Sequence, residues 1–524
     1  VAAIGASGSS GATGAIAIGN TATDVLTLDG LIYESASTQT YTAKTGAFSI
    51  LLKPGDASSK TIAFTTNAGN VKFATGDVEL YGDTTHTIDT GAGGGTVIFD
   101  GDIQSGDDGD DDILVIKSGD GAVTLTGHIG NTKELGGLLI NDGSGGSASE
   151  DGTITISNTI GNAGFGVKGT TTIGNTKTDS VSFGSSLYSF DGTTTITSET
   201  GSNINVAATA EFETLGDTLT FATGTIDLAN NANLTVNSDG GAITIFGVAG
   251  DSAETVTINA NDVSGTSVTT ETVRLGVVGD SGHAQIHNLT VSGDGGITLT
   301  GAIYTASAGD TSGADVVFND AVIIDGDVII DTDGAEADST SDGAITFATS
   351  INAQTTGSPA SSQTLTLQGG TGTITLQPIG GTAAIDALTI NTQNTATATL
   401  SVGNIGAGTV DAADNGTNFA GVTGATTIGN TNSGVITFSG TIYKTDGAFD
   451  ITSKAGNTTD KEIVFGGASP FISTSGDQVT LNGGEVEIQN GTLTINTNRN
   501  NGGDNGGAIT IAKTVYGASD ETLV

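Results

Sequence analysis

The sequence predicts an all-β protein, an elongated parallel β-solenoid with irregular insertions between its coils. Three observations lead to this fold. Hydrophobic and polar residues alternate in short runs, such as 154–156 and 435–438. Gly, Asn, Asp or Ser closes each run, and related segments recur along the chain. Because no window shows the 3.6-residue period of a helix, we expect negligible helix.

The recurrence is clearest between residues 169–198 and 424–453. These segments align without a gap, and 14 of their 30 positions are identical. A third related segment covers residues 14–50, where Leu28 and Tyr33 keep the spacing of the other copies. Such repeats are typical of chains whose coils stack on one another.

A shorter unit of strand and turn also recurs, and two geometries are compatible with it. Asp-Gly pairs, as at Asp239-Gly240, supply tight turns with positive φ. Such a turn either closes an antiparallel hairpin or bends a coil between two sides of a solenoid. The irregular intervals between units favour the solenoid, which accommodates insertions between stacked coils. The central hydrophobic residues, which we expect to point inward, are Leu28, Phe99, Leu125, Phe183, Ile245, Leu299, Phe347, Phe438 and Ile511.

Length and repeats together predict one continuous solenoid over residues 1–524, without a conventional domain boundary. At about 20–25 residues per coil and about 4.8 Å between strands, the chain makes roughly 20 to 25 coils. The result is a rod on the order of 100 to 120 Å long. Met is absent even at position 1, so we expect a processed form or an excerpt of a longer chain.

Composition removes several classes of function. The 57 Asp and Glu residues outnumber the 14 Lys and Arg residues, and the formal net charge is −43. This charge excludes nucleic acid as a partner, because phosphate backbones require a basic surface. The chain has no Cys, which excludes disulfides and thiolate chemistry. No run approaches the 18 or more apolar residues of a membrane-spanning helix, so we predict no membrane insertion.

Two acidic stretches are the candidate metal sites. Calcium prefers carboxylate oxygens, although neither stretch matches an EF-hand. A solvated acidic loop is the alternative interpretation of both. We expect no required cofactor, and calcium is the one candidate ion. The candidate ligands are Asp107, Asp108, Asp110 and Asp112 in the first stretch, and Asp325, Asp327, Asp331 and Asp333 in the second.

The sequence shows no catalytic signature around any of its four histidines. A β-helical polysaccharide hydrolase with paired carboxylates is the enzyme that the composition would allow. Such a site also needs basic and aromatic residues to hold the sugar. Residues 178–443 contain one basic residue, Arg274, and the chain has no Trp. We therefore predict that the chain is not an enzyme.

Tyrosine and threonine placement gives two further expectations. Five of the seven tyrosines lie five residues after a central hydrophobic residue, which predicts one shared role at a coil corner. Thr-x-Thr pairs such as 153–155 and 195–197 suit either an ice-binding face or the general preference of Thr for strands. The sequence shows no Thr array in every coil, which favours the second interpretation. The five tyrosines are Tyr33, Tyr188, Tyr304, Tyr443 and Tyr516.

Residues 295–303 (GGITLTGAI) and 434–442 (GVITFSGTI) carry a pattern that covers most of the chain. The pattern resembles the filamentous-haemagglutinin-like and autotransporter-type repeat exoproteins of bacterial cell surfaces. The resemblance implies a right-handed β-helix displayed outside the cell as an adhesin stalk or fibre.

Solenoid ends expose unpaired backbone groups. Head-to-tail docking of such ends does not close into a ring, so it builds an open filament. We therefore expect an extracellular structural protein, a subunit of a cell-surface filament whose partners are other copies of itself. The alternative is a stalk segment of a giant adhesin that contacts surface glycans or neighbouring cells.

Overall fold

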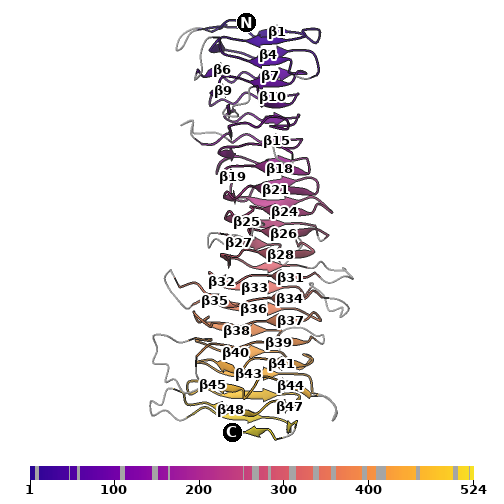
Figure 1. Cartoon of the computed structure of the whole chain (residues 1–524), viewed down its shortest axis with the longest axis vertical. Helices are drawn as coiled ribbons and strands as arrows, with labels where there is room; N and C mark the ends of the chain where they lie inside the picture. Colours follow the sequence, from indigo (N-terminus) through magenta and orange to yellow (C-terminus); the bar gives the residue numbers. More distant parts are fainter. Residues whose placement is uncertain are drawn as a thin grey trace. The chain divides into compact units, whose positions relative to one another are not determined.

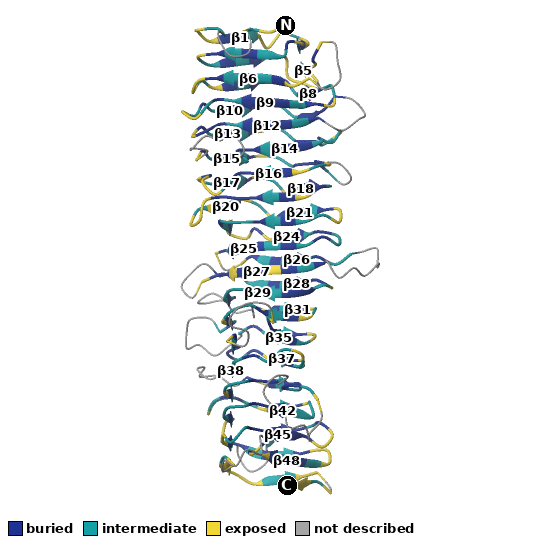
Figure 2. Cartoon of the chain, turned by 90° about the vertical axis from the view of Figure 1, so that its left-hand side faces the viewer, coloured by how far each residue is buried: buried dark blue, intermediate teal, exposed yellow. Residues whose placement is uncertain are grey.

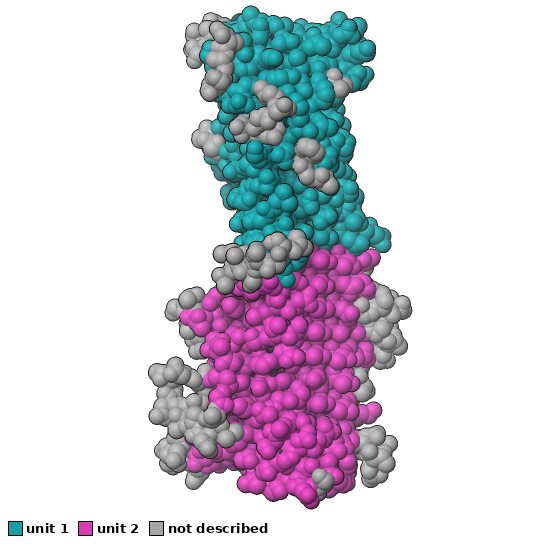
Figure 3. All heavy atoms as spheres, viewed as in Figure 1, with its two compact units in different colours: residues 1–248, 259–271 teal, residues 249–258, 272–524 magenta. Residues whose placement is uncertain are grey.

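The computed structural model describes most of the chain as strands and turns. The described residues form no helix. They divide into two compact units, coloured separately in Figure 3: unit 1 covers 1–248 and 259–271, and unit 2 covers 249–258 and 272–524. Residues 1–524 are described except 6–10, 47, 56–59, 107–111, 144–150, 163–165, 252, 263–270, 281–284, 306–313, 334–341, 356–361, 392–397, 409–419, 456–460, 500–505 and 519.

Unit 1 is a β-solenoid in which successive coils stack three columns of parallel strands (Figure 1). Its first column contains β1 (Ile16–Gly19), β4 (Gln39–Thr42), β7 (Val71–Ala74), β10 (Val97–Phe99), β13 (Val123–Leu125), β15 (Ile154–Ile156), β17 (Val181–Phe183), β20 (Asn203–Val206) and β23 (Thr225–Leu228). Its second column contains β2 (Leu26–Leu28), β5 (Ile50–Leu52), β8 (Val78–Leu80), β11 (Ile103–Ser105), β18 (Leu187–Phe190), β21 (Ala210–Thr214) and β24 (Leu234–Asn237). Its third column contains β3 (Ile32–Ser35), β6 (Ile62–Thr66), β9 (Thr85–Asp89), β12 (Ile113–Lys117), β14 (Gly137–Ile140), β16 (Thr171–Ile173), β19 (Thr194–Ile196), β22 (Leu219–Phe221) and β25 (Ile243–Ala249).

Unit 2 has the same construction, again with three columns of parallel strands. Its first column contains β26 (Thr255–Asn259), β28 (Asn288–Ser292), β31 (Val316–Phe318), β34 (Ile345–Phe347), β37 (Ile374–Leu376), β39 (Leu400–Val402), β41 (Ile436–Phe438), β44 (Lys461–Phe465), β47 (Glu485–Ile488) and β50 (Val515–Gly517). Its second column contains β27 (Thr272–Val278), β29 (Gly296–Leu299), β32 (Val322–Ile324), β35 (Ile351–Ala353), β42 (Ile442–Lys444), β45 (Phe471–Ser473), β48 (Thr492–Asn496) and β51 (Thr522–Leu523). Its third column contains β30 (Ile303–Tyr304), β33 (Val328–Asp331), β36 (Thr364–Gln368), β38 (Ala387–Ile390), β40 (Thr426–Ile428), β43 (Phe449–Thr452), β46 (Val479–Asn482) and β49 (Ile509–Ile511).

The alternating pattern places one set of side chains in the core of each coil. On strands such as β13, β15 and β16, buried residues alternate with half-buried ones (Figure 2). In-register pairing then stacks similar side chains on one another. The ring centroids of Tyr41 and Phe73 lie 5.3 Å apart, and those of Phe73 and Phe99 lie 4.6 Å apart. The predicted inward orientation is confirmed for the central hydrophobic residues except Ile511, which is half-buried.

The internal repeat has a structural counterpart in each unit. In unit 1 the second column continues between β11 and β18 through single bridging residues, Ile129 and Ile160. In unit 2 the second column continues between β35 and β42 in the same way, through Ile379 and Ile405. The related segments 169–198 and 424–453 both begin at a third-column strand, β16 in unit 1 and β40 in unit 2, whereas segment 14–50 begins at the first-column strand β1.

Parallel pairing decides between the two geometries that the turns allowed. The described strands pair in parallel, as β4 does with β7, so Asp-Gly pairs bend a coil and do not close hairpins. The single antiparallel contact among the described residues is the bridge of Ser475 with Asn498. The all-β parallel solenoid is therefore confirmed.

The coil count was predicted too high. In the described part of the chain, the columns hold nine rungs in unit 1 and at most ten in unit 2, fewer than the 20 to 25 coils expected. Asn203 and Thr225, which pair on neighbouring rungs, are 22 residues apart in the sequence, whereas the paired residues Leu388 and Thr426 are 38 residues apart. Insertions between the strands account for the difference. The handedness of the coils and the single continuous body over 1–524 stay predictions.

Candidate functional site

The structure describes one residue of the first acidic stretch, Asp112, whose carboxylate is buried in unit 1. Asp107, Asp108 and Asp110 are outside the described residues. Asp112 is fully buried, and its carboxylate accepts hydrogen bonds from the Ser105 hydroxyl at 2.8 Å and the Thr84 amide at 3.3 Å. These bonds hold a structural carboxylate between two coils.

A buried histidine faces this carboxylate. His86 is fully buried on β9, and its Nε2 lies 3.5 Å from Asp112 Oδ1. Neither ring nitrogen of His86 makes a hydrogen bond in the described structure. No sequence pattern indicates this pair, because the two residues belong to neighbouring coils.

The second acidic stretch divides between separate contacts in unit 2. Asp325 forms an ion pair with Arg274 at 3.0 Å. Asp327 accepts hydrogen bonds from the amide and hydroxyl of Thr364, at 3.1 and 2.9 Å. Asp327 therefore connects neighbouring rungs, whereas the Arg274–Asp325 pair spans two rungs.

Asp331 and Asp333 lie with Asp342 at the corner that follows β33. The Asp331 carboxylate accepts a hydrogen bond from the Asp333 amide at 2.9 Å, and Asp342 accepts from the Thr371 amide at 2.6 Å. Burial, followed by the charge of neighbouring Asp residues, raises the pKa of both Asp331 and Asp333 to about 6. No cation in the described structure offsets this repulsion, since Arg274 pairs with Asp325.

The five predicted ligands that the structure describes do not share one site: Asp112 lies in unit 1, and the other four divide between separate contacts in unit 2. Among the residues that the structure describes, no group of three or more His, Cys, Asp or Glu side chains has the geometry to hold a metal ion. Calcium binding by these residues stays a prediction.

The corners carry polar side chains that were not among the predicted site residues. In unit 1, hydroxyls of Thr66, Thr90 and Ser118 donate to backbone carbonyls across the turn, at 2.5, 3.0 and 2.6 Å. A hydroxyl residue at the end of a strand, shortly before glycine, is the sequence signal that marks these positions. Each bond satisfies a carbonyl at a buried turn.

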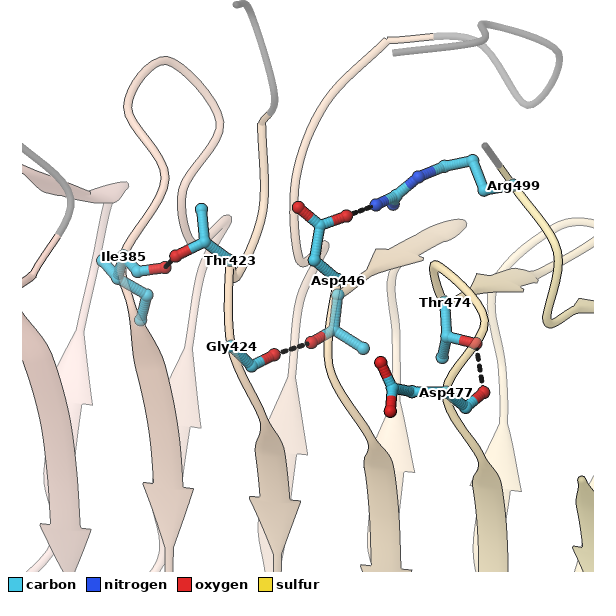
Figure 4. A network of polar contacts seen from close by, with 8 residues as sticks. Ile385, Thr423, Gly424, Asp446, Thr474, Asp477 and Arg499 are labelled. Carbon is cyan, nitrogen blue, oxygen red and sulfur yellow. Dashed lines mark hydrogen bonds and ion pairs between the residues drawn. The ribbon is translucent and has the colours of Figure 1, made fainter. Parts of the chain in front are cut away.

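Unit 2 repeats this device at the corner between its second and third columns (Figure 4). The Thr445 hydroxyl donates to Gly424 O at 2.6 Å, and the Thr474 hydroxyl to Asp477 O at 2.5 Å. Beside them the guanidinium of Arg499 pairs with the Asp446 carboxylate. No sequence pattern predicts that pair, because 53 residues separate its members.

Three tyrosines share one role at a bend. Tyr33, Tyr188 and Tyr443 are fully buried, and each hydroxyl bonds to the backbone of the residue three positions earlier, at 2.9, 2.7 and 2.8 Å. Burial raises the pKa of Tyr188 to about 12. The predicted shared role is wrong for Tyr516, which is half-buried and donates to Glu485. Tyr304 is also half-buried.

One hollow of about 470 Å³ lies on unit 1, over residues 11–13, 34–36 and 65–67. Its one charged lining residue is Glu34. A lone carboxylate lacks the partner that glycoside hydrolysis needs. The hollow therefore gives no support to the polysaccharide hydrolase.

We found no match to this chain among protein-family models, curated proteins or solved structures. The fold is that of a β-helix repeat protein, as the resemblance implied, while the exoprotein type stays a prediction. The described residues also contain no helix with the length and apolarity needed to cross a membrane.

Proposed function

We propose that this chain is an extracellular structural protein, a subunit of a cell-surface fibre. The observation that supports it most is the stacking of coils within each unit. Strands pair in register from rung to rung in all three columns, and the buried side chains stack along the same direction. Such a body resists bending and proteolysis, because each coil contacts mainly its neighbours over its whole perimeter.

In this proposal, copies assemble from end to end at the rung of β49, β50 and β51 in unit 2. Ile509 and Leu523 are 49% and 41% exposed, whereas Val479 and Leu493, their partners on the preceding rung, are fully buried. An exposed strand edge with apolar side chains binds a further strand. A second copy docked there makes a heterologous contact, and contacts of this kind build filaments.

Surface charge fits the same function. The net charge of −43 repels neighbouring fibres from the side and keeps them in solution. Lateral repulsion leaves the ends as the surfaces where copies meet. Glycans or neighbouring cells are the further partners that a surface fibre would contact.

Negative-stain electron microscopy of the purified chain tests this proposal. We expect filaments for the native chain and single particles for Ile509→Asp combined with Leu523→Asp, because charge at the apolar edge opposes docking. Leu215→Asp is the control, since Leu215 is 55% exposed and belongs to unit 1, not to this rung of unit 2. Single particles of the native chain at every concentration, with affinity for glycans, would favour the adhesin stalk. Turnover of a polysaccharide that depends on one carboxylate pair would favour the enzyme.

A further inference from the structure

Threonine side chains form a regular outward row on the third column of unit 1. The row contains Thr172, Thr195, Thr220 and Thr244, which are paired in register on four consecutive rungs. Each is half-buried between two inward-facing neighbours. The row appears only after folding, because the four residues are spaced unevenly in the sequence.

A second row runs beside the first, two residues earlier on each rung. It contains Thr170, Thr193, Thr218 and Ala242, all at least partly exposed. The carbonyls of the last three accept hydrogen bonds from the preceding rungs, which keeps this row in register as well. Unit 1 therefore presents a two-row face of small side chains with seven hydroxyls in eight positions.

Unit 2 presents a longer version on its own third column. The central row is Thr366, Thr389, Thr427, Asp450, Thr480 and Thr510, again paired rung by rung. The flanking row is Thr364, Ala387, Ala425, Ala448, Gln478 and Ala508.

Two properties separate these faces from an ordinary solvated strand. First, the hydroxyls of the nine central-row threonines make no hydrogen bond within the part of the chain that the structure describes, so all nine are available to water. Second, charge is nearly absent: Asp450 is the one charged residue in the two double rows. In a chain with 71 charged residues this depletion sets the faces apart from the acidic corners.

The spacing of the hydroxyls matches tetrahedral water. Neighbouring strands lie about 4.7–4.9 Å apart. Water molecules joined by hydrogen bonds of about 2.75 Å in a tetrahedral network have second neighbours about 4.5 Å apart. A row of hydroxyls along the column therefore offers donors and acceptors at nearly the repeat of an ordered water lattice. The methyl groups between them exclude competing disordered water.

From this geometry we infer that the central threonine rows of the third columns, with the small side chains that flank them, bind an ordered water lattice, the surface of ice. This activity is independent of end-to-end assembly, which uses a different surface. Crystalline polysaccharide is the main competing ligand for a flat face, but sugar-binding faces carry aromatic rings. The double rows contain none.

Partition into slowly growing ice tests the inference with the full chain. We expect the native chain to enter the ice fraction and to shape ice crystals. A variant that combines four substitutions should lose both effects, because bulky charge breaks the lattice match in both units. The substitutions are Thr195→Lys, Thr220→Lys, Thr389→Lys and Thr427→Lys. A second variant with Tyr at the same four positions adds bulk with a residue that favours strands, and it should also abolish both.

The control places Lys at Thr235 and Thr298. Thr235 lies on the second column of unit 1, where it pairs with Glu211. Thr298 lies on the second column of unit 2, between Arg274 and Ile323. Neither residue belongs to a threonine row. The control should enter ice like the native chain, and circular dichroism melting should report folded protein in every case. Exclusion of the native chain from ice overturns the inference, as does unchanged ice entry of both folded row variants. Binding to cellulose or chitin powder without entry into ice would assign the faces to polysaccharide.

Discussion

Asp331 shows how a single carboxylate responds to its place in the solenoid. Its pKa rises from the usual 3.8 to about 6 because burial disfavours the charged form, and Asp333 and Asp342 add repulsion. The folded state therefore binds the proton more tightly than the unfolded state. The resulting stabilisation is fully present below about pH 3.8 and is lost as the pH rises through about 6.

Replacing this carboxyl by a neutral amide removes the penalty at neutral pH. We expect Asp331→Asn to raise the melting temperature at pH 7.5 and to leave it nearly unchanged at pH 4. Circular dichroism melts at both pH values measure the effect. Asp320→Asn is the matched control, because that carboxylate accepts a hydrogen bond from the Gly293 amide at 2.8 Å and should not gain stability at pH 7.5. A lower melting temperature for Asp331→Asn at pH 7.5 would contradict the account.

Single residues also mark the limit of prediction from sequence. The spacing of tyrosines from a central hydrophobic residue was visible, and three of the five rings share a buried corner. The spacing alone did not show which way the rings point, and the structure buries Tyr33, Tyr188 and Tyr443 in the core. The His86–Asp112 pair was invisible, since its contact depends on the register between coils.

The corner after a third-column strand is the element that recurs with the sequence repeat. Gly174 and Gly429 both have φ of 75°. After Gly429, the Asn430 amide donates to Ser433 Oγ at 2.9 Å, and the Asn432 amide to Asn430 Oδ1 at 2.7 Å. A β-carbon at Gly429 would lie 2.3 Å from the carbonyl oxygen of Thr452 on the next rung. Glycine is therefore required both by the backbone and by the close approach.

We expect Gly429→Ala to cost about 1–3 kcal/mol of unfolding free energy, the usual cost of a strained backbone position. Gly14→Ala is the control, because a β-carbon there meets nothing within 4 Å. Urea unfolding of the two variants makes the comparison. Equal stability of the two variants would show that the corner relaxes freely.

Elements were predictable where the pattern was local. Strand runs such as Val181–Phe183 and the turn glycines follow from alternation and φ requirements. Coil length was not predictable, because insertions at corners leave the period-2 pattern of the strands unchanged. The threonine rows were missed for the same reason: uneven coil lengths hide an array that only the register reveals.

At the scale of the whole molecule, negative charge is the main property of the surface. A net charge of −43 opposes compaction, and screening or bridging of carboxylates relieves the repulsion. Calcium bound at the predicted acidic loops would add stability beyond this screening.

We therefore expect millimolar calcium to raise the melting temperature above that in chelator at low ionic strength. Sodium chloride adjusted to equal ionic strength is the control, and the calcium effect should exceed it. Equal melting temperatures in chelator, sodium and calcium would remove the eight predicted ligands as a metal site and leave them as solubilising surface.

The central claim is that residues 1–524 form one continuous parallel solenoid. Small-angle X-ray scattering of the monomeric chain at moderate salt tests it most directly. Nine and ten rungs stacked in one continuous column at about 4.8 Å per rung predict a stiff, elongated particle with one cross-section and a length on the order of 90 Å. A near-spherical particle, or two bodies joined by a flexible link, would contradict the claim.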